Sequence, residues 1–254
     1  MLSALAVAVT LTSAHADVIG HRKLVWKDEF DGSGALDSAK WNYDTGPVYN
    51  NEKEKYVDDI DYVRVVKGNL VITADNRSGK VRSGRINTKA SWLYGYFEVR
   101  AKFPTGKGTW PAIWFLGDIL RKPGANVDWP TCGEIDLMEN VGFNPNDIHF
   151  TVHTADAGGK GEASKGEHIT IPSAWSDFHV YGLDWQADHL DFYCDGKKVS
   201  TYAKDPANPN SWPFDRPEYL ILNLAIGGDW GGTKGIDPAI FPAKFYVDYV
   251  RVYQ

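Results

Sequence analysis

Residues 94–103 read YGYFEVRAKF, and this stretch shows the pattern that decides the fold. Every second residue from 97 to 103 is apolar, whereas residues 98, 100 and 102 are charged. A period of two places the apolar side chains on one face of a β-strand and the charged side chains on the other. The stretch therefore predicts a strand with one buried face.

The same period recurs on both sides of this stretch. Residues 62–73 (YVRVVKGNLVIT) place two β-branched runs around Lys67-Gly68-Asn69, and residues 189–202 hold Asp195-Gly196 between apolar runs. Both patterns predict hairpins. Residues 219–226 are almost all apolar, as in a strand that is covered on both faces. Alternating stretches also lie at residues 178–185 and 244–253.

No window of the sequence supports a long amphipathic helix. The 25 glycines and 13 prolines interrupt the strand patterns at short intervals, as in a β-sandwich. We interpret residues 118–131 and 155–166 as loops, because Gly, Pro and polar residues dominate them. The sequence thus predicts an all-β fold, a sandwich of antiparallel sheets that forms one domain over residues 24–254.

The composition excludes two classes of partner. The 254 residues carry 27 Lys and Arg against 33 Asp and Glu, which gives a net charge of −6. Such a chain lacks the basic footprint of a nucleic-acid-binding protein and the basic amphipathic face that binds an anionic membrane. It contains 10 Trp, 13 Tyr and 11 Phe, and these side chains suit both β-packing and stacking on sugars.

The first 16 residues are interpreted as a secretory signal peptide. Residues 2–12 form an uncharged apolar run too short to span a bilayer, and Ala14-His15-Ala16 then supplies a small-x-small cleavage site. The alternative is a buried apolar strand. A signal peptide predicts that the mature protein is secreted, either to the periplasm or to the medium.

Cys132 and Cys194 are too few for a disulfide framework, and we expect two buried thiols, although export would permit one bridge. No CxxC pair is present, which argues against a zinc ribbon. His149 and His153 share one strand face, but no third metal ligand stands out near them.

The carboxylates of residues 132–140, CGEIDLMEN, stand out from the rest of the sequence. Glu134 and Asp136 share one face of a strand, whereas Glu139 has the wrong parity unless an extra residue at Leu137-Met138 forms a β-bulge. A helix would turn Glu134 and Glu139 apart by about 140°. We therefore predict a bulged strand that presents three acids on one face.

Three acids on one sheet face suit glycoside hydrolysis, in which one carboxylate attacks and another carboxyl group protonates the leaving oxygen. A solvated acidic face and a calcium site are the two alternatives. Trp110, Trp114, Trp129 and Trp230 lie in segments rich in Gly and Pro, where a loop seldom buries so large a ring. These rings favour a sugar-binding site.

At this point the sequence resembles glycoside hydrolase family 16, in particular its laminarinase-type endo-β-1,3-glucanases. The motif GEIDLME with its extra residue is specific for the bulged branch of that family. The resemblance covers the chain from residue 26 to its end and rests on these segments: WKDEF (26–30), SGRI (83–86), YGYFEVR (94–100), GTWPAIW (108–114), GEIDLME (133–139), FYCDG (192–196) and LNLAIGG (222–228).

The resemblance implies a concanavalin-like jelly roll with a substrate cleft on its concave sheet. It implies Glu134 as nucleophile, Asp136 as its helper and Glu139 as acid/base, with no cofactor for catalysis. It further assigns sugar contacts to Asn51, Arg85, Trp110, Trp114, Trp129 and His153. We add Trp230 to these sugar-binding residues because it lies in a glycine-rich loop. The family often has Gln and a second Tyr after Asn-Asn-Glu, whereas this chain continues with KEKYV (53–57).

A structural Ca²⁺ on the convex side is also implied, with a carboxylate from Asp248 and backbone oxygens from Glu29 and Gly68.

Together the sequence patterns and the resemblance predict a secreted, monomeric, retaining endo-β-1,3-glucanase that hydrolyses laminarin-type glucans. A relative that cleaves mixed-linkage glucan or an algal galactan is the alternative within enzymes. A non-catalytic, lectin-like β-glucan-binding protein is the alternative from another class. The sequon Asn76-Arg-Ser78 is meaningful only in a eukaryotic secretory path.

Overall fold

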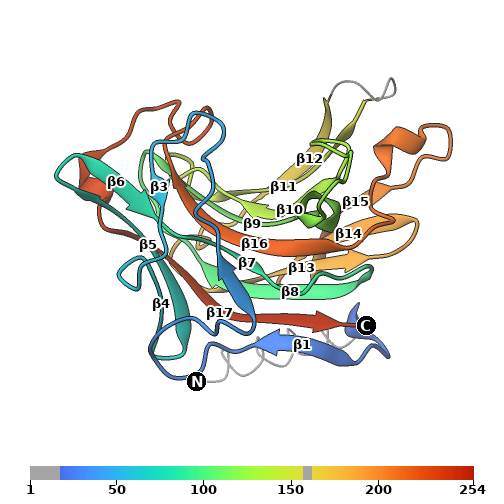
Figure 1. The fold of residues 1–254 in the computed structure, drawn as a ribbon, viewed down its shortest axis with the longest axis horizontal. Coiled ribbons are helices and arrows are strands. Elements are labelled where there is room, and N and C mark those ends of the chain that lie inside the picture. The colour runs from blue at the N-terminus through green and yellow to red at the C-terminus, as the bar shows by residue number, and fades with distance from the viewer. Residues whose placement is uncertain (1–17, 157–161) are drawn as a thin grey trace.

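The computed structural model describes residues 18–156 and 162–254, and two stacked β-sheets form their framework (Figure 1). The predicted signal peptide falls outside the described residues. The ten-stranded sheet contains β1 (Leu24–Asp28), β3 (Lys55–Tyr56), β4 (Val63–Val66), β5 (Asn69–Arg77), β6 (Lys80–Ser83), β8 (Gly95–Lys102), β13 (His179–Trp185), β14 (His189–Cys194), β15 (Lys197–Ala203) and β17 (Ala243–Tyr253).

The seven-stranded sheet contains, in this order, β12 (Glu162–Thr170), β11 (Asp147–Ala155), β10 (Glu134–Glu139), β9 (Thr109–Gly117), β16 (Glu218–Ile226), β7 (Arg85–Thr88) and β2 (Trp41–Tyr43). Its strands β9, β10 and β16 bow with their hollow side turned away from the other sheet (Figure 1). Three short 3₁₀ helices lie in the loops between strands: η1 (Asp118–Arg121), η2 (Pro209–Ser211) and η3 (Pro238–Ile240).

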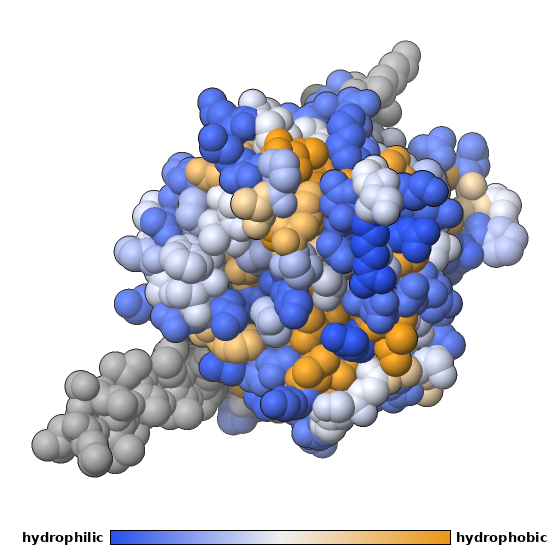
Figure 2. Space-filling model, turned by 90° about the vertical axis from the view of Figure 1, so that its left-hand side faces the viewer, coloured by the Kyte–Doolittle hydropathy of each residue, from blue (hydrophilic) through white to orange (hydrophobic). Residues whose placement is uncertain are grey.

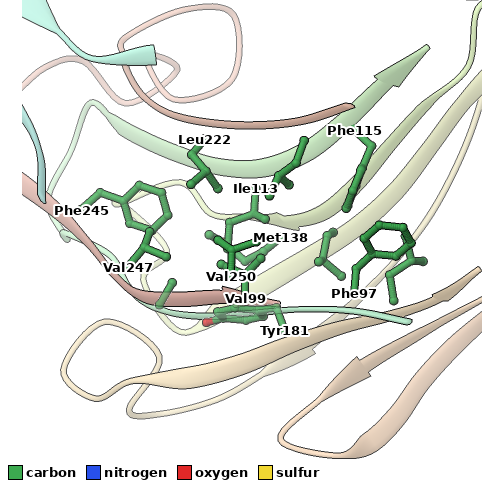
Figure 3. Close-up of a cluster of buried hydrophobic side chains, with 14 of the residues drawn as sticks. Phe97, Val99, Ile113, Phe115, Met138, Tyr181, Leu222, Phe245, Val247 and Val250 are labelled. Atoms are coloured by element: carbon green, nitrogen blue, oxygen red, sulfur yellow. The ribbon is translucent and has the colours of Figure 1, made fainter. Parts of the chain in front are cut away.

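The apolar faces of the two sheets meet in one core. Figure 3 shows Ile113, Phe115 and Leu222 of the seven-stranded sheet pointing toward Phe97 and Val250 of the other sheet. All five side chains are buried. Because side chains alternate along each strand, residues 112, 114 and 116 of β9 must lie on the outer, concave face. The predicted all-β jelly-roll sandwich is confirmed.

Both predicted hairpins are present, with two-residue turns whose residues have positive φ. Lys67 and Gly68 join β4 to β5 at φ values of 51° and 81°, and Asp195 and Gly196 join β14 to β15 at 49° and 75°. Two consecutive positive φ values match the right-handed twist of the paired strands. Cys132 and Cys194 are free, buried thiols, as expected.

The predicted loop at 155–166 is wrong at its described ends, because Ala155 closes β11 and β12 begins at Glu162. Strand β12 is an exposed edge strand with the sequence EASKGEHIT. It has no apolar alternation because almost none of its side chains reach the core, and a periodicity argument therefore misses it.

The face at the left of Figure 1 is largely hydrophilic with small apolar patches (Figure 2).

Glu218, the first residue of β16, is an unusual member of the interior. Its side chain is 1% exposed, and neither carboxyl oxygen has a hydrogen-bond partner among the described residues. A Cβ at Gly133 would lie only 2.9 Å from Glu218 Oε1, so the carboxyl group packs directly against the start of β10. Burial, reinforced by repulsion from Glu134 and Asp136, raises the pKa of Glu218 well above its usual value.

We predict that Glu218→Leu stabilises the protein. The folded state holds the Glu218 proton, whereas the unfolded chain releases it above about pH 4.3, so this carboxyl group costs more stability as the pH rises from there. Removing a buried polar group without partners should add about 1–3 kcal/mol. Urea unfolding at acidic and at neutral pH measures the gain, which should be larger at neutral pH.

Glu218→Gln is the matched control for this substitution. It removes the titration but still buries an unpartnered amide, so its gain should be smaller than that of Glu218→Leu. A Glu218→Leu protein no more stable than the parent at neutral pH would contradict the prediction.

Candidate active site

The predicted bulge in β10 is confirmed by the register of its two neighbours. Against β9, Asp136 pairs with Trp114 and Met138 with Ile113, so the register shifts between Asp136 and Met138. Against β11 the register also shifts between Asp136 and Glu139. Leu137 and Met138 are both fully buried. Two consecutive residues therefore face the core, and Glu139 returns to the same face as Glu134 and Asp136.

Each outer acid accepts a hydrogen bond from an indole N–H. Trp129 Nε1 donates to Glu134 Oε2 at 2.8 Å, and Trp110 Nε1 donates to Glu139 Oε1 at 2.9 Å. Trp110 lies on β9 beside Glu139, whereas Trp129 lies in the loop before β10 and is 46% exposed. The two tryptophans thus hold the carboxyl groups of the two glutamates in place from opposite ends of β10.

Asp136 sits between the glutamates and contacts a histidine of β11. His153 Nε2 lies 3.0 Å from Asp136 Oδ2, and His153 Nδ1 lies 2.6 Å from Glu162 Oε1 on β12. Burial alone would lower the pKa of His153, but Asp136, Glu134 and Glu162 together raise it to about 10. His153 is therefore a cation at neutral pH and offsets part of the negative charge of the site.

Both glutamates hold protons more tightly than an exposed glutamate. Burial and then the charge of Asp136 raise the pKa of Glu134 well above its usual value and that of Glu139 to about 8. Because Glu139 also raises the pKa of Glu134, these two carboxyl groups do not titrate independently. The array therefore keeps a proton available near neutral pH, which a general acid requires.

The spacing of three ligand atoms here would also suit a metal ion. One atom each from Glu134, Asp136 and His153 lie within 4.8 Å of one another. His153 is protonated and already contacts Asp136, so a metal would have to displace its proton and this contact. The arrangement fits proton transfer better than metal coordination.

Trp230 completes an aromatic wall at the Glu139 end of the concave face. Its ring centroid lies 5.5 Å from that of Trp110 and 4.7 Å from that of His149, in edge-to-face geometry. His149 in turn stacks on His168 of β12 at 5.5 Å. Four aromatic rings from β9, β11, β12 and the loop after β16 thus meet on one side of the acids.

The residues expected on the glycone side lie beyond β9. Arg85 on β7 pairs in register with Asn223 on β16, and its guanidinium lies 4.4 Å above the ring of Tyr56. Asn51 Nδ2 donates to Asp229 Oδ1 at 2.8 Å. The structure therefore brings the predicted sugar-binding residues onto the same face as the acids, distributed from β7 to β11.

The sequence analysis assigned no role at this site to four polar residues of the face: Tyr56, His149, Asn223 and Asp229. Asn223 had a readable signal, because it is the single polar residue of the apolar stretch 219–226. Its Oδ1 accepts a hydrogen bond from Trp114 Nε1 at 2.8 Å. The contacts of Tyr56 and Asp229 join segments more than 160 residues apart, and no spacing pattern reports them.

The predicted calcium ligands lie on the other sheet. Asp248 on β17 forms an ion pair with Arg100 at 2.5 Å, and both carboxyl oxygens of Glu29 bind Arg251 at 2.9 Å. Gly68 lies in the turn between β4 and β5. Backbone oxygens and a carboxylate suit Ca²⁺, but the ion would compete with the Arg100 guanidinium for Asp248.

Comparison with known proteins agrees with this geometry. The model of the family "Glycosyl hydrolases family 16" matches residues 48–251. The chain is 43% identical to a β-glucanase of Rhodothermus marinus, over 100% of this chain and 93% of that protein.

Two solved structures share the fold. The laminarinase from Rhodothermus marinus superposes with a TM-score of 0.84 at 43% identity, covering 92% of this chain and 98% of that chain. The laminarinase from Flavobacterium sp. UMI-01 superposes with a TM-score of 0.81 at 39% identity, covering 91% and 100%. The family match spans most of the sequence and includes the bulged strand with its three acids, so the chain belongs to glycoside hydrolase family 16.

Proposed function

We propose that this protein is an endo-β-1,3-glucanase that hydrolyses laminarin-type β-glucans with retention of anomeric configuration. The observation that carries the proposal is the bulge at Leu137–Met138, which places Glu134, Asp136 and Glu139 on one face. The 43% identity to the laminarinase from Rhodothermus marinus supports the substrate class. Catalysis by enzymes of this family needs no cofactor.

The positions of the acids assign their roles. Glu134 attacks the anomeric carbon and forms a glycosyl-enzyme, while Glu139 protonates the leaving oxygen and then takes a proton from water. A pKa of about 8 keeps Glu139 protonated at neutral pH. The His153 cation and the Trp129 N–H both favour the ionised form of Glu134, which is the form that attacks. Asp136 and the His153 cation lie 3.0 Å apart, and their charges act on Glu134 in opposite directions. As substrate displaces water, the Trp129 N–H holds the attacking carboxylate in orientation.

Parallel assays on laminarin, lichenan and agarose test the substrate class. Release of reducing sugar from laminarin supports the proposal. Release from lichenan or agarose alone would assign the chain to mixed-linkage glucan or galactan. A lectin-like β-glucan-binding protein would release nothing from any of them, and that result would overturn the enzyme proposal.

The proposal also places the protein outside the cytoplasm as a monomer. The apolar run at 2–12 and the small-x-small site at 14–16 support export. Among residues 18–156 and 162–254, no helix is long and apolar enough to cross a membrane.

Replacement of the two glutamates tests their roles. Glu134→Ala and Glu139→Ala should each lower turnover of laminarin by at least about 100-fold. On an aryl glycoside with a good leaving group, azide should rescue both variants with different products. In Glu134→Ala it replaces the nucleophile and gives an α-glycosyl azide; in Glu139→Ala it intercepts the glycosyl-enzyme and gives a β-glycosyl azide. The opposite pair of products, identified by NMR, would reverse the assignment.

Trp110→Phe should shift the pH dependence of kcat. The Trp110 N–H bond favours the ionised form of Glu139, so its loss should raise the pKa of Glu139 further above 8. The protonated acid is the active form, and kcat therefore falls as the pH rises through this pKa. In Trp110→Phe that fall should occur at higher pH.

Trp114→Phe is the matched control, because Trp114 donates to Asn223 and not to a carboxylate. The alkaline fall of its kcat should stay where the parent has it. Equal shifts in both variants would show that loss of an indole N–H from this face, and not the bond to Glu139, sets the titration.

We further propose a structural Ca²⁺ bound by backbone oxygens of Glu29 and Gly68 and by the Asp248 carboxylate. A chelator should then lower the melting temperature, and Ca²⁺ should restore it. Because Arg100 competes for Asp248, Arg100→Gln should increase the shift between the chelated and the Ca²⁺-loaded protein. An unchanged melting temperature on chelation would refute the site.

A further inference from the structure

Two acids that the proposed mechanism does not use lie beside the glycone side of the concave face. Glu52 and Glu54 precede β3, in a segment that docks on the end of β16 through Lys53 N–H, which donates to Ile226 O at 2.9 Å. Glu54 is 4% exposed, and its Oε2 accepts the Ile226 N–H at 2.7 Å. Its Oε1 is buried, and no N–H or hydroxyl group among the described residues donates to it. A buried carboxylate oxygen without a donor costs stability, so a donor is needed here.

Glu52 is the group placed to supply that donor. Burial, a hydrogen bond from its own carboxyl group to Glu54 and repulsion by Glu54 raise the pKa of Glu52 to about 8. A protonated Glu52 donates to Glu54, and one proton then serves two carboxyl groups. Sharing a proton also avoids placing a second negative charge next to the buried Glu54, because Glu52 is itself half-buried.

The charged and titratable groups around the pair do not remove this need. Arg85 on β7 attracts the negative form of Glu52, but it is already paired with Asp44 at 2.9 Å. Tyr56 donates to Glu52, whereas Asp229, in the loop after β16, binds Asn51. Two further charges on the segment, Lys53 and Lys55, are exposed to solvent.

A chain of hydrogen bonds leads from the pair to the floor of the concave face. Trp114 Nε1 donates to Asn223 Oδ1 at 2.8 Å, and Asn223 Nδ2 donates to Tyr56 Oη at 3.0 Å. Tyr56 Oη donates to Glu52 Oε2 at 3.3 Å. The three bonds run in one direction, from Trp114 to Glu52, and a protonated Glu52 extends the chain by one more bond to Glu54. Trp114 pairs in register with Asp136, which brings this end of the chain next to the acids.

We propose that Glu52 and Glu54 share one proton and act as positioning residues, which hold Trp114 and the glycone side of the concave face through Tyr56 and Asn223. Loss of the shared proton leaves two adjacent carboxylates, whose repulsion loosens the segment 52–56 from the end of β16. The role of this pair in binding β-1,3-glucan rests on the proposed function, whereas its effect on Trp114 does not.

Glu54→Gln tests the pair with almost no change in shape. The glutamine Oε1 can accept the Ile226 N–H, and its Nε2 can donate to an ionised Glu52, so no shared proton is needed. The first readout is the indole N–H resonance of Trp114 in the ligand-free protein, assigned by its absence in Trp114→Phe. In the parent this resonance should shift with a midpoint near pH 8, and in Glu54→Gln the shift should be absent.

Glu139→Gln is the control, because Glu139 also titrates near pH 8 on the same face. The Trp114 shift should persist in Glu139→Gln. A shift that vanishes in Glu139→Gln and persists in Glu54→Gln would overturn the proposal, and so would a Trp114 resonance that does not move with pH in the parent.

Binding of laminaritriose is the second readout, measured on Glu134→Gln so that no turnover occurs. Affinity should fall severalfold as the pH rises through 8 in this variant and stay level when Glu54→Gln is added. Equal pH dependence in both proteins would overturn the role in substrate binding. If laminaritriose binds at no pH while the Trp114 titration behaves as expected, the proposed glucan substrate fails and the carboxyl pair stands.

Discussion

The parity of β10 is the constraint on which the site depends. A strand without a bulge would send Glu139 into the core, where Ile113 and Phe115 pack, and an ionisable group there would have no partner. The extra residue at Leu137–Met138 buries two consecutive apolar side chains and returns Glu139 to the concave face. One residue in the backbone register thus converts a structural strand into one that carries three acids.

Crowding of the acids creates both the cost and the chemistry of the site. Carboxyl groups that are crowded into one site resist ionisation, and Glu139 thereby keeps its proton near neutral pH. Indole N–H donors at both ends of β10 and the His153 cation offset part of this repulsion. A second pair, Glu52 and Glu54, repeats the principle on the glycone side, where a shared proton completes a chain that ends at Trp114.

The alternating period of the sequence predicted the sandwich and both hairpins, because strands with one buried face must alternate and two-residue turns need residues that tolerate positive φ. It failed at β12, whose side chains lie on the surface and obey no such rule. The bulge in β10 was predicted correctly for a related reason, because the spacing of the three acids fits one strand face only if an extra residue is present. Glu218 carries no such signal, since nothing in the sequence tells a buried carboxyl group from an exposed one.

The sequence by itself therefore determined the fold class and the bulged acidic strand, both of which follow from local period and spacing. Only the tertiary structure decided which side chains meet. The contacts between Tyr56 and Asn223 and between Asn51 and Asp229 join residues more than 160 positions apart. Sheet order brings β3, β7 and β16 together, and strand register then sets each partner. The protonation states of the acidic side chains depend on those partners and on burial, so the tertiary structure decides them as well.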